Sequence, residues 1–511
     1  MVTLNAGHSL LIRADANTQI GAGHFMRCLA LAQGWQDRGG KVVFVTACEN
    51  KGLRERLAQE GLEVTPVEQP HPDPADWETT SKALKEHSGA WTVLDGYHFD
   101  SSYQCRIKET GHPLLVIDDM AHLERYYADV ILNQNLHASK LLYECESDTE
   151  LLMGTRYALL RREFLQWPGR RREVGETAHK VLVTMGASDP DDVTSKVIHA
   201  LDRVDQQRLE ATVVVGASNP HGEAVRAAGG SSRHSVRLVR NTDDMPELMA
   251  WADFAISAAG STCWELAFMG VPSVLLVLAE NQRRVADGLA KVGAAVNLGP
   301  PNGYTEEQLA EELRTWLVDY GEVADKMTSR GRRLVDGLGT TRVVEMLQGC
   351  RIRLRPVVQE DCRLLWQWAN DPVVRAAAFS SDPIPWESHV DWFDSHLRDP
   401  TCYMYIAETA KGCPIGQVRL DTEDGGAVID VSLAPDYRGK GYSVSVIDRA
   451  VRRFFRDGGG REVHAYVKPE NISSRRAFRG AGFLEVGVIQ IGALNAVHYL
   501  LNRSSDRRER E

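Results

Sequence analysis

A glycine turn followed by a histidine is the first feature of this sequence that could do chemistry. Residues Gly21-Ala22-Gly23-His24 separate the apolar run SLLIRA from a helical pattern that begins HFMRCLALA. Glycine lets the backbone approach a ligand, and the free N–H groups at a helix start favour an anion or a polar sugar. Histidine titrates near neutral pH, so His24 could take a proton from water. The alternative is a histidine that only caps the helix, because short glycine patterns are common.

A second group of hydroxyls lies where another apolar run passes into a helical pattern. The stretch SAAGST ends at Thr262, and Glu265 follows about one helical turn later. Hydroxyls and N–H groups at a helix start hold a diphosphate, and a carboxylate one turn further accepts ribose hydroxyls. We therefore predict nucleotide binding by Ser261, Thr262 and Glu265, with ordinary helix capping as the alternative.

The loop GASD at residues 186–189 follows the strand-like run KVLVTM and offers another surface for phosphate. Ser188 and Asp189 could equally be helix caps. Asp189-Pro190-Asp191 has the spacing of a metal-binding DxD motif. Acidic residues at a helix start are favoured by the helix dipole without a metal, and proline suits a first helical turn. We expect no metal.

A third glycine loop lies near the end of the chain. The stretch RGKGYS spans residues 438–443, between the run AVIDVSL and an amphipathic helical pattern. Successive N–H groups in such a loop wrap a pyrophosphate. Asn471 and Ser474 open another helical pattern, which ends at GAGF. The two elements together are more specific than either glycine run alone.

Length and composition exclude several classes of protein. The composition, 43% hydrophobic and 25% charged, is typical of a globular protein. At roughly 150 residues per domain, the length of 511 residues predicts about three domains. A net charge of −11 removes the basic field that general nucleic-acid binding needs. No apolar stretch reaches the ~18 residues of a membrane span, no secretory signal is visible, and nine cysteines without a CxxC pair fit reduced thiols. We expect a cytoplasmic protein that binds small molecules, not nucleic acid or membrane.

Three predicted domains position these groups. Residues 1–165 and residues 175–347 each alternate strand-like and helical runs, which predicts two doubly wound parallel sheets. Ligands of such sheets lie beyond the carboxyl ends of the strands, and two facing halves make a cleft. Residues 350–503 mix strands and helices differently. The predicted fold is therefore α/β, a pair of doubly wound domains followed by an α+β domain.

Four stretches give the first two domains a family resemblance. IRADANTQIGAGHFMRCLALA, LDGY, MGASDP and ISAAGSTCWELAFMGVPSVLLVLAENQ together resemble the UDP-sugar hydrolase of pseudaminic acid biosynthesis over about residues 9–346. The resemblance implies a glycosyltransferase type B-like fold and an inverting, metal-independent attack of water on UDP-2,4-diacetamido-2,4,6-trideoxy-β-L-altropyranose. It implies that His24 is the base and that Tyr97 and Asn281 line the sugar site. The residues that it implies for UDP-sugar binding are Arg13, Asp15, Gly21, Gly23, Gly186, Ser188, Ser261, Thr262, Glu265 and Gln282. Arg27 belongs to the same motif but lies in the helix, which it could simply brace.

The last domain resembles the GNAT acetyl-CoA-dependent N-acetyltransferases over about residues 350–500. WQWANDPVVR, the spaced His389 and Trp392, and PIGQVRL are similar to the branch that acetylates the 4-amino group of UDP-4-amino-4,6-dideoxy-N-acetyl-β-L-altrosamine. The resemblance implies acetyl-CoA as acetyl donor, with its pyrophosphate on the loop N–H groups. The implied acetyl-CoA-binding residues are Leu433, Arg438, Gly439, Lys440, Gly441, Ser443, Asn471 and Ser474.

Two positions depart from the GNAT pattern. Ser443 replaces the usual glycine or alanine of the loop, which is a mild change. Phe478 stands where the family often has the tyrosine that protonates the departing thiolate, and phenylalanine has no proton to give. Asp430 is a candidate base for the amine, although the alternation of the strand could leave it on the solvent face.

The two resemblances point to one pathway, because the product of the acetyltransferase is the substrate of the hydrolase. Joining consecutive steps raises the local concentration of the intermediate. The sequence thus predicts a bifunctional nucleotide-sugar enzyme. The alternative is a type B glycosyltransferase or a hydrolase of a related UDP-sugar, with a last domain that acetylates another amine or only binds CoA.

Overall fold

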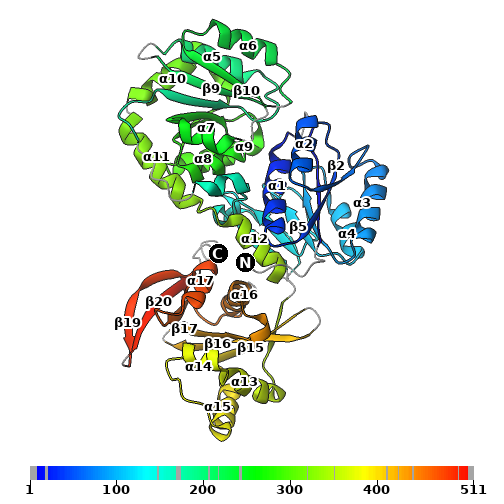
Figure 1. The fold of residues 1–511 in the computed structure, drawn as a ribbon, viewed down its shortest axis with the longest axis vertical. Helices are drawn as coiled ribbons and strands as arrows, with labels where there is room; N and C mark the ends of the chain where they lie inside the picture. Colours follow the sequence, from blue (N-terminus) through cyan, green and yellow to red (C-terminus); the bar gives the residue numbers. More distant parts are fainter. Residues whose placement is uncertain are drawn as a thin grey trace. The chain divides into compact units, whose positions relative to one another are not determined.

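The computed structural model divides into two compact units between Val343 and Val344. The first unit contains two parallel sheets, and the second contains one mixed sheet (Figure 1). The structure describes residues 9–17, 21–146, 149–167, 174–204, 208–216, 218–240, 244–318, 320–349, 352–409, 412–423, 425–439, 442–492 and 494–503. None of the helices in these ranges is long and apolar enough to cross a membrane.

The first sheet has seven parallel strands in the order β3-β2-β1-β4-β5-β6-β7. They are β1 (Ser9–Ala14), β2 (Lys41–Thr46), β3 (Glu63–Pro66), β4 (Trp91–Asp95), β5 (Leu114–Ile117), β6 (Val130–Asn133) and β7 (Glu150–Met153). The first five strands are connected by α1 (Gly23–Gln36), α2 (Lys51–Gln59), α3 (Pro74–Glu86) and α4 (Ser101–Glu109). The runs KVVFVT and WTVLD are almost wholly buried, as parallel strands covered by helices should be. The strand order reverses between β1 and β4, where Ala14 pairs with Asp95, and such a switch point is where ligands bind.

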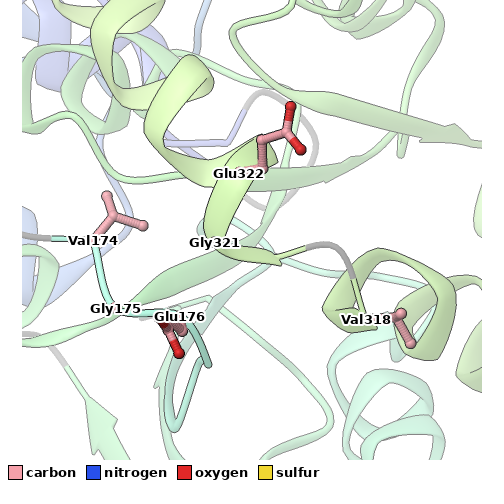
Figure 2. Close-up of a pocket in the computed structure, with 6 residues that line it drawn as sticks. All are labelled: Val174, Gly175, Glu176, Val318, Gly321 and Glu322. Carbon is pink, nitrogen blue, oxygen red and sulfur yellow. The ribbon is translucent and has the colours of Figure 1, made fainter.

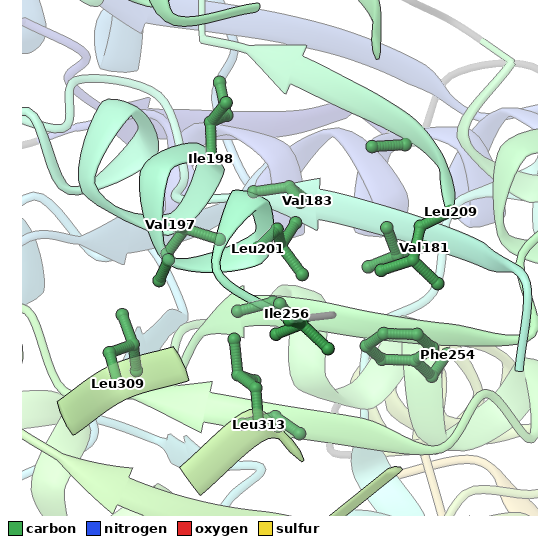
Figure 3. Close-up of a cluster of buried hydrophobic side chains, with 14 of the residues drawn as sticks. Val181, Val183, Val197, Ile198, Leu201, Leu209, Phe254, Ile256, Leu309 and Leu313 are labelled. Carbon is green, nitrogen blue, oxygen red and sulfur yellow. The ribbon is translucent and has the colours of Figure 1, made fainter. Parts of the chain in front are cut away.

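The second sheet has six parallel strands in the order β10-β9-β8-β11-β12-β13. They are β8 (Lys180–Thr184), β9 (Glu210–Val215), β10 (Ser235–Arg240), β11 (Phe254–Ala258), β12 (Ser273–Leu276) and β13 (Val296–Gly299). The helices of this half are α5 (Val193–Asp202), α6 (Gly222–Ser231), α7 (Met245–Trp251), α8 (Thr262–Met269), α9 (Glu280–Lys291), α10 (Glu306–Val318) and α11 (Tyr320–Leu334). Helix α12 (Gly339–Gly349) contains the division between the two units. Figure 3 shows Val183 and Ile256 of the two central strands packed with Leu201 of α5 and Leu313 of α10. This core fixes the ends of β8 and β11, from which two of the predicted ligand loops start.

The second unit has a seven-stranded sheet in the order β14-β15-β16-β17-β18-β20-β19. Its strands are β14 (Arg353–Pro356), β15 (Cys402–Glu408), β16 (Pro414–Glu423), β17 (Gly426–Leu433), β18 (Glu462–Val467), β19 (Leu484–Ile491) and β20 (Leu494–Asn502). Its helices are α13 (Cys362–Ala369), α14 (Pro372–Ala377), α15 (Trp386–Arg398), α16 (Tyr442–Arg456) and α17 (Ile472–Gly480). β17 and β18 run parallel, and the other neighbours are antiparallel. The predicted fold class, a doubly wound pair followed by an α+β domain, is confirmed.

Candidate functional site

His24 lies in the first turn of α1, directly after the glycine turn. Gly21 has a φ of +75°, which glycine adopts readily and other residues avoid. The His24 residue is only 8% exposed, and its Nδ1 lies 2.6 Å from Oδ1 of Asp95 at the end of β4. A carboxylate only accepts hydrogen bonds, so Nδ1 must carry the proton of this contact. Nε2 of a neutral His24 therefore holds the lone pair, as a general base requires.

Arg27, one turn further along α1, keeps the Asp95 carboxylate ionised. Its guanidinium donates twice to Asp95, at 2.7 Å each, and twice to Asp119, at 2.7 and 3.0 Å. Burial alone would favour the neutral acid. The charge of Arg27 and the hydrogen bonds that Arg27 and His24 donate nevertheless hold the pKa of the Asp95 carboxyl below its ordinary value. Arg27 thus braces the site through two carboxylates.

Tyr97 and Asn281 join His24 from two other elements. The Tyr97 hydroxyl donates to Oδ2 of Asp119 at 2.8 Å, and Nδ2 of Asn281 donates to that hydroxyl at 3.4 Å. The His24 and Tyr97 rings meet edge to face with centroids 4.8 Å apart. Burial and the Asp119 charge raise the pKa of Tyr97, so this side chain stays a neutral phenol. The structure thus brings together the predicted base, from α1, and the two side chains predicted to line the sugar site, from the β4 loop and the start of α9.

Arg13 and Asp15 lie inside the protein, with no exposed surface. Arg13 is paired with Asp15 and with Asp76 of α3. Asp15 also accepts from the Ala47 N–H at 2.7 Å and contacts Nε2 of His98 at 2.9 Å. These contacts with protein groups hold the end of β1 beside Asp95. Direct UDP-sugar binding by Arg13 and Asp15 stays a prediction, and the role that their surroundings favour is support of this edge.

The glycine turn of the first half lies beside the hydroxyl motif of the second. A Cβ placed on Gly23 would lie 3.5 Å from Oγ of Ser261, so a larger side chain at Gly23 would fill the space between them. Ser261 precedes α8 and makes no side-chain capping bond to it, which disfavours the capping alternative for this hydroxyl. Thr262 begins α8, and Oε1 of Glu265 accepts from Nη2 of Arg161 at 2.9 Å.

The loop after β8 is backed closely by the end of β9. Gly186 has a φ of +85°, and a Cβ there would meet no atom within 4 Å. Asp189 accepts from the N–H groups of Val193 and Thr194 at 2.9 Å each, so this carboxylate caps α5. No group of three or more His, Cys, Asp or Glu suited to a metal occurs among the residues that the structure describes.

Two of the remaining predicted groups serve the ends of helices. Oε1 of Gln282 accepts from the Leu278 N–H at 3.0 Å, beside the start of α9. In the second unit, Oδ1 of Asn471 accepts from the Ser474 N–H at 3.1 Å and caps α17. These side-chain oxygens are engaged by backbone, so any contact of Gln282, Asn471 or Ser474 with a ligand stays a prediction.

Arg438, in the predicted pyrophosphate loop of the second unit, has one guanidinium nitrogen that makes no hydrogen bond within the described part of the chain. Arg438 donates through Nε to the Leu433 carbonyl at 2.9 Å and through Nη1 to Asp371 at 2.7 Å. Its Nη2 is buried and has no hydrogen-bond partner in the described part of the chain. Gly439 has a φ of +68° with open space at its Cβ position, and Ser443 lies in the first turn of α16. A buried guanidinium donor beside an open glycine fits an anionic group such as a pyrophosphate; Lys440 and Gly441 lie outside the described residues.

Phe478 and Asp430 have opposite surroundings. Phe478 is buried and packs against Phe483 and Tyr499, with ring centroids 5.2 and 6.2 Å apart. Asp430 is exposed on β17, where Oδ2 accepts from Nε2 of Gln417 at 3.2 Å. The alternation of β17 therefore exposes Asp430, and its role as a base stays a prediction.

A cavity of about 480 Å³ is lined by a different set of residues, which Figure 2 shows. Its lining residues are Val174, Gly175, Glu176, Val318, Gly321 and Glu322. None of the predicted site residues lines it. Glu322 is largely exposed and paired with Lys326, so this cavity shows no buried polar group aimed at a ligand. We therefore define the candidate site by the side chains that converge around His24, and not by this cavity.

Two family models match the chain. Residues 180–330 match the glycosyltransferase family 28 C-terminal domain, and residues 351–484 match the acetyltransferase (GNAT) domain. Among solved structures, spermidine N-acetyltransferase from Vibrio cholerae in complex with CoA and spermine is 21% identical, with a TM-score of 0.28 over 30% of this chain and 96% of that chain. The boundary between the two family matches falls near the division between the two compact units.

Curated relatives cover the first unit or nearly the whole chain. The uncharacterized protein MJ1062 of Methanocaldococcus jannaschii is 23% identical over 93% of this chain and 96% of its own length. The spore coat polysaccharide biosynthesis protein SpsG of Bacillus subtilis is 27% identical over 66% of this chain and 97% of its own. The UDP-2,4-diacetamido-2,4,6-trideoxy-beta-L-altropyranose hydrolase of Campylobacter jejuni is 26% identical over 56% of this chain and 98% of its own. The predicted resemblance is confirmed. The chain joins a part similar to this hydrolase to a GNAT domain.

Sequence reasoning missed two carboxylates of the hydrolase-like site. Asp95 accepts from His24 and Arg27, and Asp119 accepts from Arg27, Tyr97 and Asn135. Both follow or end buried strands, in the runs WTVLD and LLVIDD. The signal that could have found them was a carboxylate at the carboxyl end of β4, next to β1, and another after β5, next to β4, because parallel strand ends meet at one edge.

Proposed function

We propose that the first unit hydrolyses a UDP-linked sugar. The observation that carries the proposal is the His24–Asp95 contact, which leaves Nε2 of His24 as the basic nitrogen. A water oxygen attacks the anomeric carbon, its proton goes to Nε2, and the bond to the diphosphate oxygen breaks with its electron pair on UDP. UDP is a stable leaving group, so positioning and a base supply most of the catalysis, and no metal is needed. Attack from the face opposite UDP inverts the anomeric centre.

UDP would be held by the second half of this unit. The N–H groups at the start of α8, the hydroxyls of Ser261 and Thr262 and the loop at Gly186 and Ser188 suit the diphosphate. Glu265 suits the ribose hydroxyls, and Tyr97 and Asn281 suit the sugar. The match to a glycosyltransferase C-terminal domain over residues 180–330 supports a nucleotide on this side. Gly21 and Gly23 leave room for the sugar next to His24.

The substrate that we propose is UDP-2,4-diacetamido-2,4,6-trideoxy-β-L-altropyranose, the sugar named for the Campylobacter jejuni relative. We further propose that the second unit acetylates the 4-amino group of its precursor. Bound acetyl-CoA would supply the acetyl group; Arg438, Gly439 and the following loop would hold its pyrophosphate, with Leu433 beside the pantetheine. The amine nitrogen would attack the thioester carbon, the carbon–sulfur bond would break with CoA leaving as thiolate, and the proton lost by the amine would pass to water. Since Phe478 has no proton, the thiolate takes one from water.

The two-step reaction of the full chain tests this proposal. The chain is incubated with UDP-4-amino-4,6-dideoxy-N-acetyl-β-L-altrosamine and acetyl-CoA, and products are followed by mass spectrometry. We expect free CoA, then UDP and free diacetamido sugar, with UDP release requiring no acceptor other than water. The variant H24N should stop at the acetylated UDP-sugar while it still binds UDP.

Two outcomes would contradict parts of the proposal. Release of UDP only with a second sugar or lipid acceptor would indicate a glycosyltransferase, which the family 28 match also favours. Binding of CoA without release of CoA above background would indicate a second unit that serves only as a binding module.

A further inference from the structure

Tyr97 is held by its backbone as well as by its hydroxyl. The Tyr97 carbonyl oxygen lies 3.3 Å from Nε2 of His122, and the Tyr97 and His122 rings meet edge to face with centroids 5.8 Å apart. On its other side, Nδ1 of His122 lies 3.0 Å from Oδ2 of Asp118. His122 thus links the loop after β5 to the loop after β4.

The two partners of His122 determine its charge. A carbonyl oxygen and a carboxylate both accept hydrogen bonds and donate none. Each ring nitrogen of His122 must therefore carry a proton for both contacts to exist, and a ring with two N–H groups is an imidazolium. A neutral His122 has one N–H, so it must give up either Asp118 or the Tyr97 carbonyl.

The surroundings keep Asp118 ionised and the loop in place. Its carboxylate accepts from the N–H groups of Met120 and Ala121 at 2.8 and 2.7 Å and from the hydroxyls of Tyr126 and Tyr143 at 3.0 and 2.9 Å. Ala121 has a φ of +52°, a strained conformation for alanine that these contacts to Asp118 stabilise. The titratable groups that face His122 are Asp118, with Tyr126 and Tyr143 behind it, and Tyr97.

We propose that His122, as an imidazolium, is a positioning residue that fixes the backbone of Tyr97 in the hydrolytic site. The proposal rests on the proposed hydrolysis. The hydrogen bond to Asp118 raises the pKa of His122 above the ordinary histidine value, so the charged form extends to higher pH and is lost as pH rises through that raised pKa. Hydrolysis should therefore fall on the alkaline side, as His122 loses its charge.

Nuclear magnetic resonance tests the charge without any activity measurement. The full chain is labelled with ¹⁵N-histidine, and the His122 signals are assigned by their loss in H122Q. At pH 6.5 we expect both nitrogens of His122 to be protonated, and in D118N we expect the His122 titration to move to lower pH. One unprotonated nitrogen at pH 6.5, or a titration unmoved in D118N, would overturn the proposal.

The pH profile of hydrolysis tests the positioning role. H122R keeps a cation with several donors at every pH, so it should retain kcat and lose the alkaline decline. H122Q should lower kcat about fivefold at pH 7, the worth of roughly one hydrogen bond, and also lose that decline. H179Q, at an exposed histidine of the second half, is the control and should keep the wild-type profile.

An alkaline decline that persists in both His122 variants would overturn the proposal. If neither the wild-type chain nor any variant hydrolyses the substrate, the proposed function fails. The nuclear magnetic resonance titration would still decide the charge of His122.

Discussion

Asp95 is the carboxylate that links His24 and Arg27 in the proposed hydrolytic site. It accepts from His24, from two nitrogens of Arg27 and from the Cys28 thiol at 3.4 Å, with no exposed surface of its own. One carboxylate thus orients the proposed base, fixes its tautomer and neutralises the buried guanidinium. Asp95 performs these tasks through its charge and its shape. A substitution that keeps the shape and removes the charge therefore tests the contribution of the charge alone.

The variant D95N keeps the shape of this side chain and removes its charge. Its amide nitrogen can donate to Nδ1 of His24, which moves the ring proton to Nε2 and removes the base. We expect kcat for hydrolysis to fall about 100-fold or more, with UDP binding unchanged, because the residues proposed to hold UDP belong to the other half. Steady-state kinetics and UDP titration by calorimetry measure the two effects. A fall in kcat that only follows the fraction of folded protein in thermal melts would reduce Asp95 to a structural role.

At the scale of elements, the sequence predicted where the site residues gather but not what each one touches. The runs around β1, β4 and β11 are apolar enough to be read as buried parallel strands, and such strands bring their carboxyl ends to one edge. The pairing of Ala14 with Asp95 is a long-range register that no local pattern encodes. For the same reason Arg13, a charged residue in a motif predicted to bind the ligand, could not be recognised as fully buried and paired.

Gly216 lies directly against the backbone of the loop between β8 and α5. A Cβ on Gly216, just after β9, would lie 2.2 Å from the Ala187 oxygen and 2.4 Å from the Gly186 oxygen, both backbone atoms. We expect G216A to push this loop away, to destabilise the first unit by roughly 1–3 kcal/mol and to raise KM for the UDP-sugar. Urea unfolding and steady-state kinetics measure both. G230A, in helix α6 with open space at its Cβ, is the matched control and should be neutral or slightly stabilising; equal effects of the two variants would contradict the prediction.

At the scale of the whole molecule, the two proposed chemistries are assigned to two units with separate hydrophobic cores. Val183, Ile256 and Leu313 belong to a core of the first unit, whereas Ile429, Val446 and Phe478 belong to the core of the second. Each candidate site is built from residues of its own unit. A substitution in one site should therefore leave the other chemistry intact.

The variants H24N and R438Q test this separation in the full chain. H24N should release CoA at the wild-type rate and accumulate the acetylated UDP-sugar, because its base acts only on water in the first unit. R438Q loses the buried donor, so its KM for acetyl-CoA should rise about tenfold, while its hydrolysis of supplied acetylated UDP-sugar stays unchanged. Chromatography of CoA and UDP from one reaction follows both steps.

An equimolar mixture of the two variants should restore the free sugar after a lag, because the intermediate must diffuse between chains and loses the local concentration that the fusion provides. Slower hydrolysis in R438Q would instead show that the two sites are coupled.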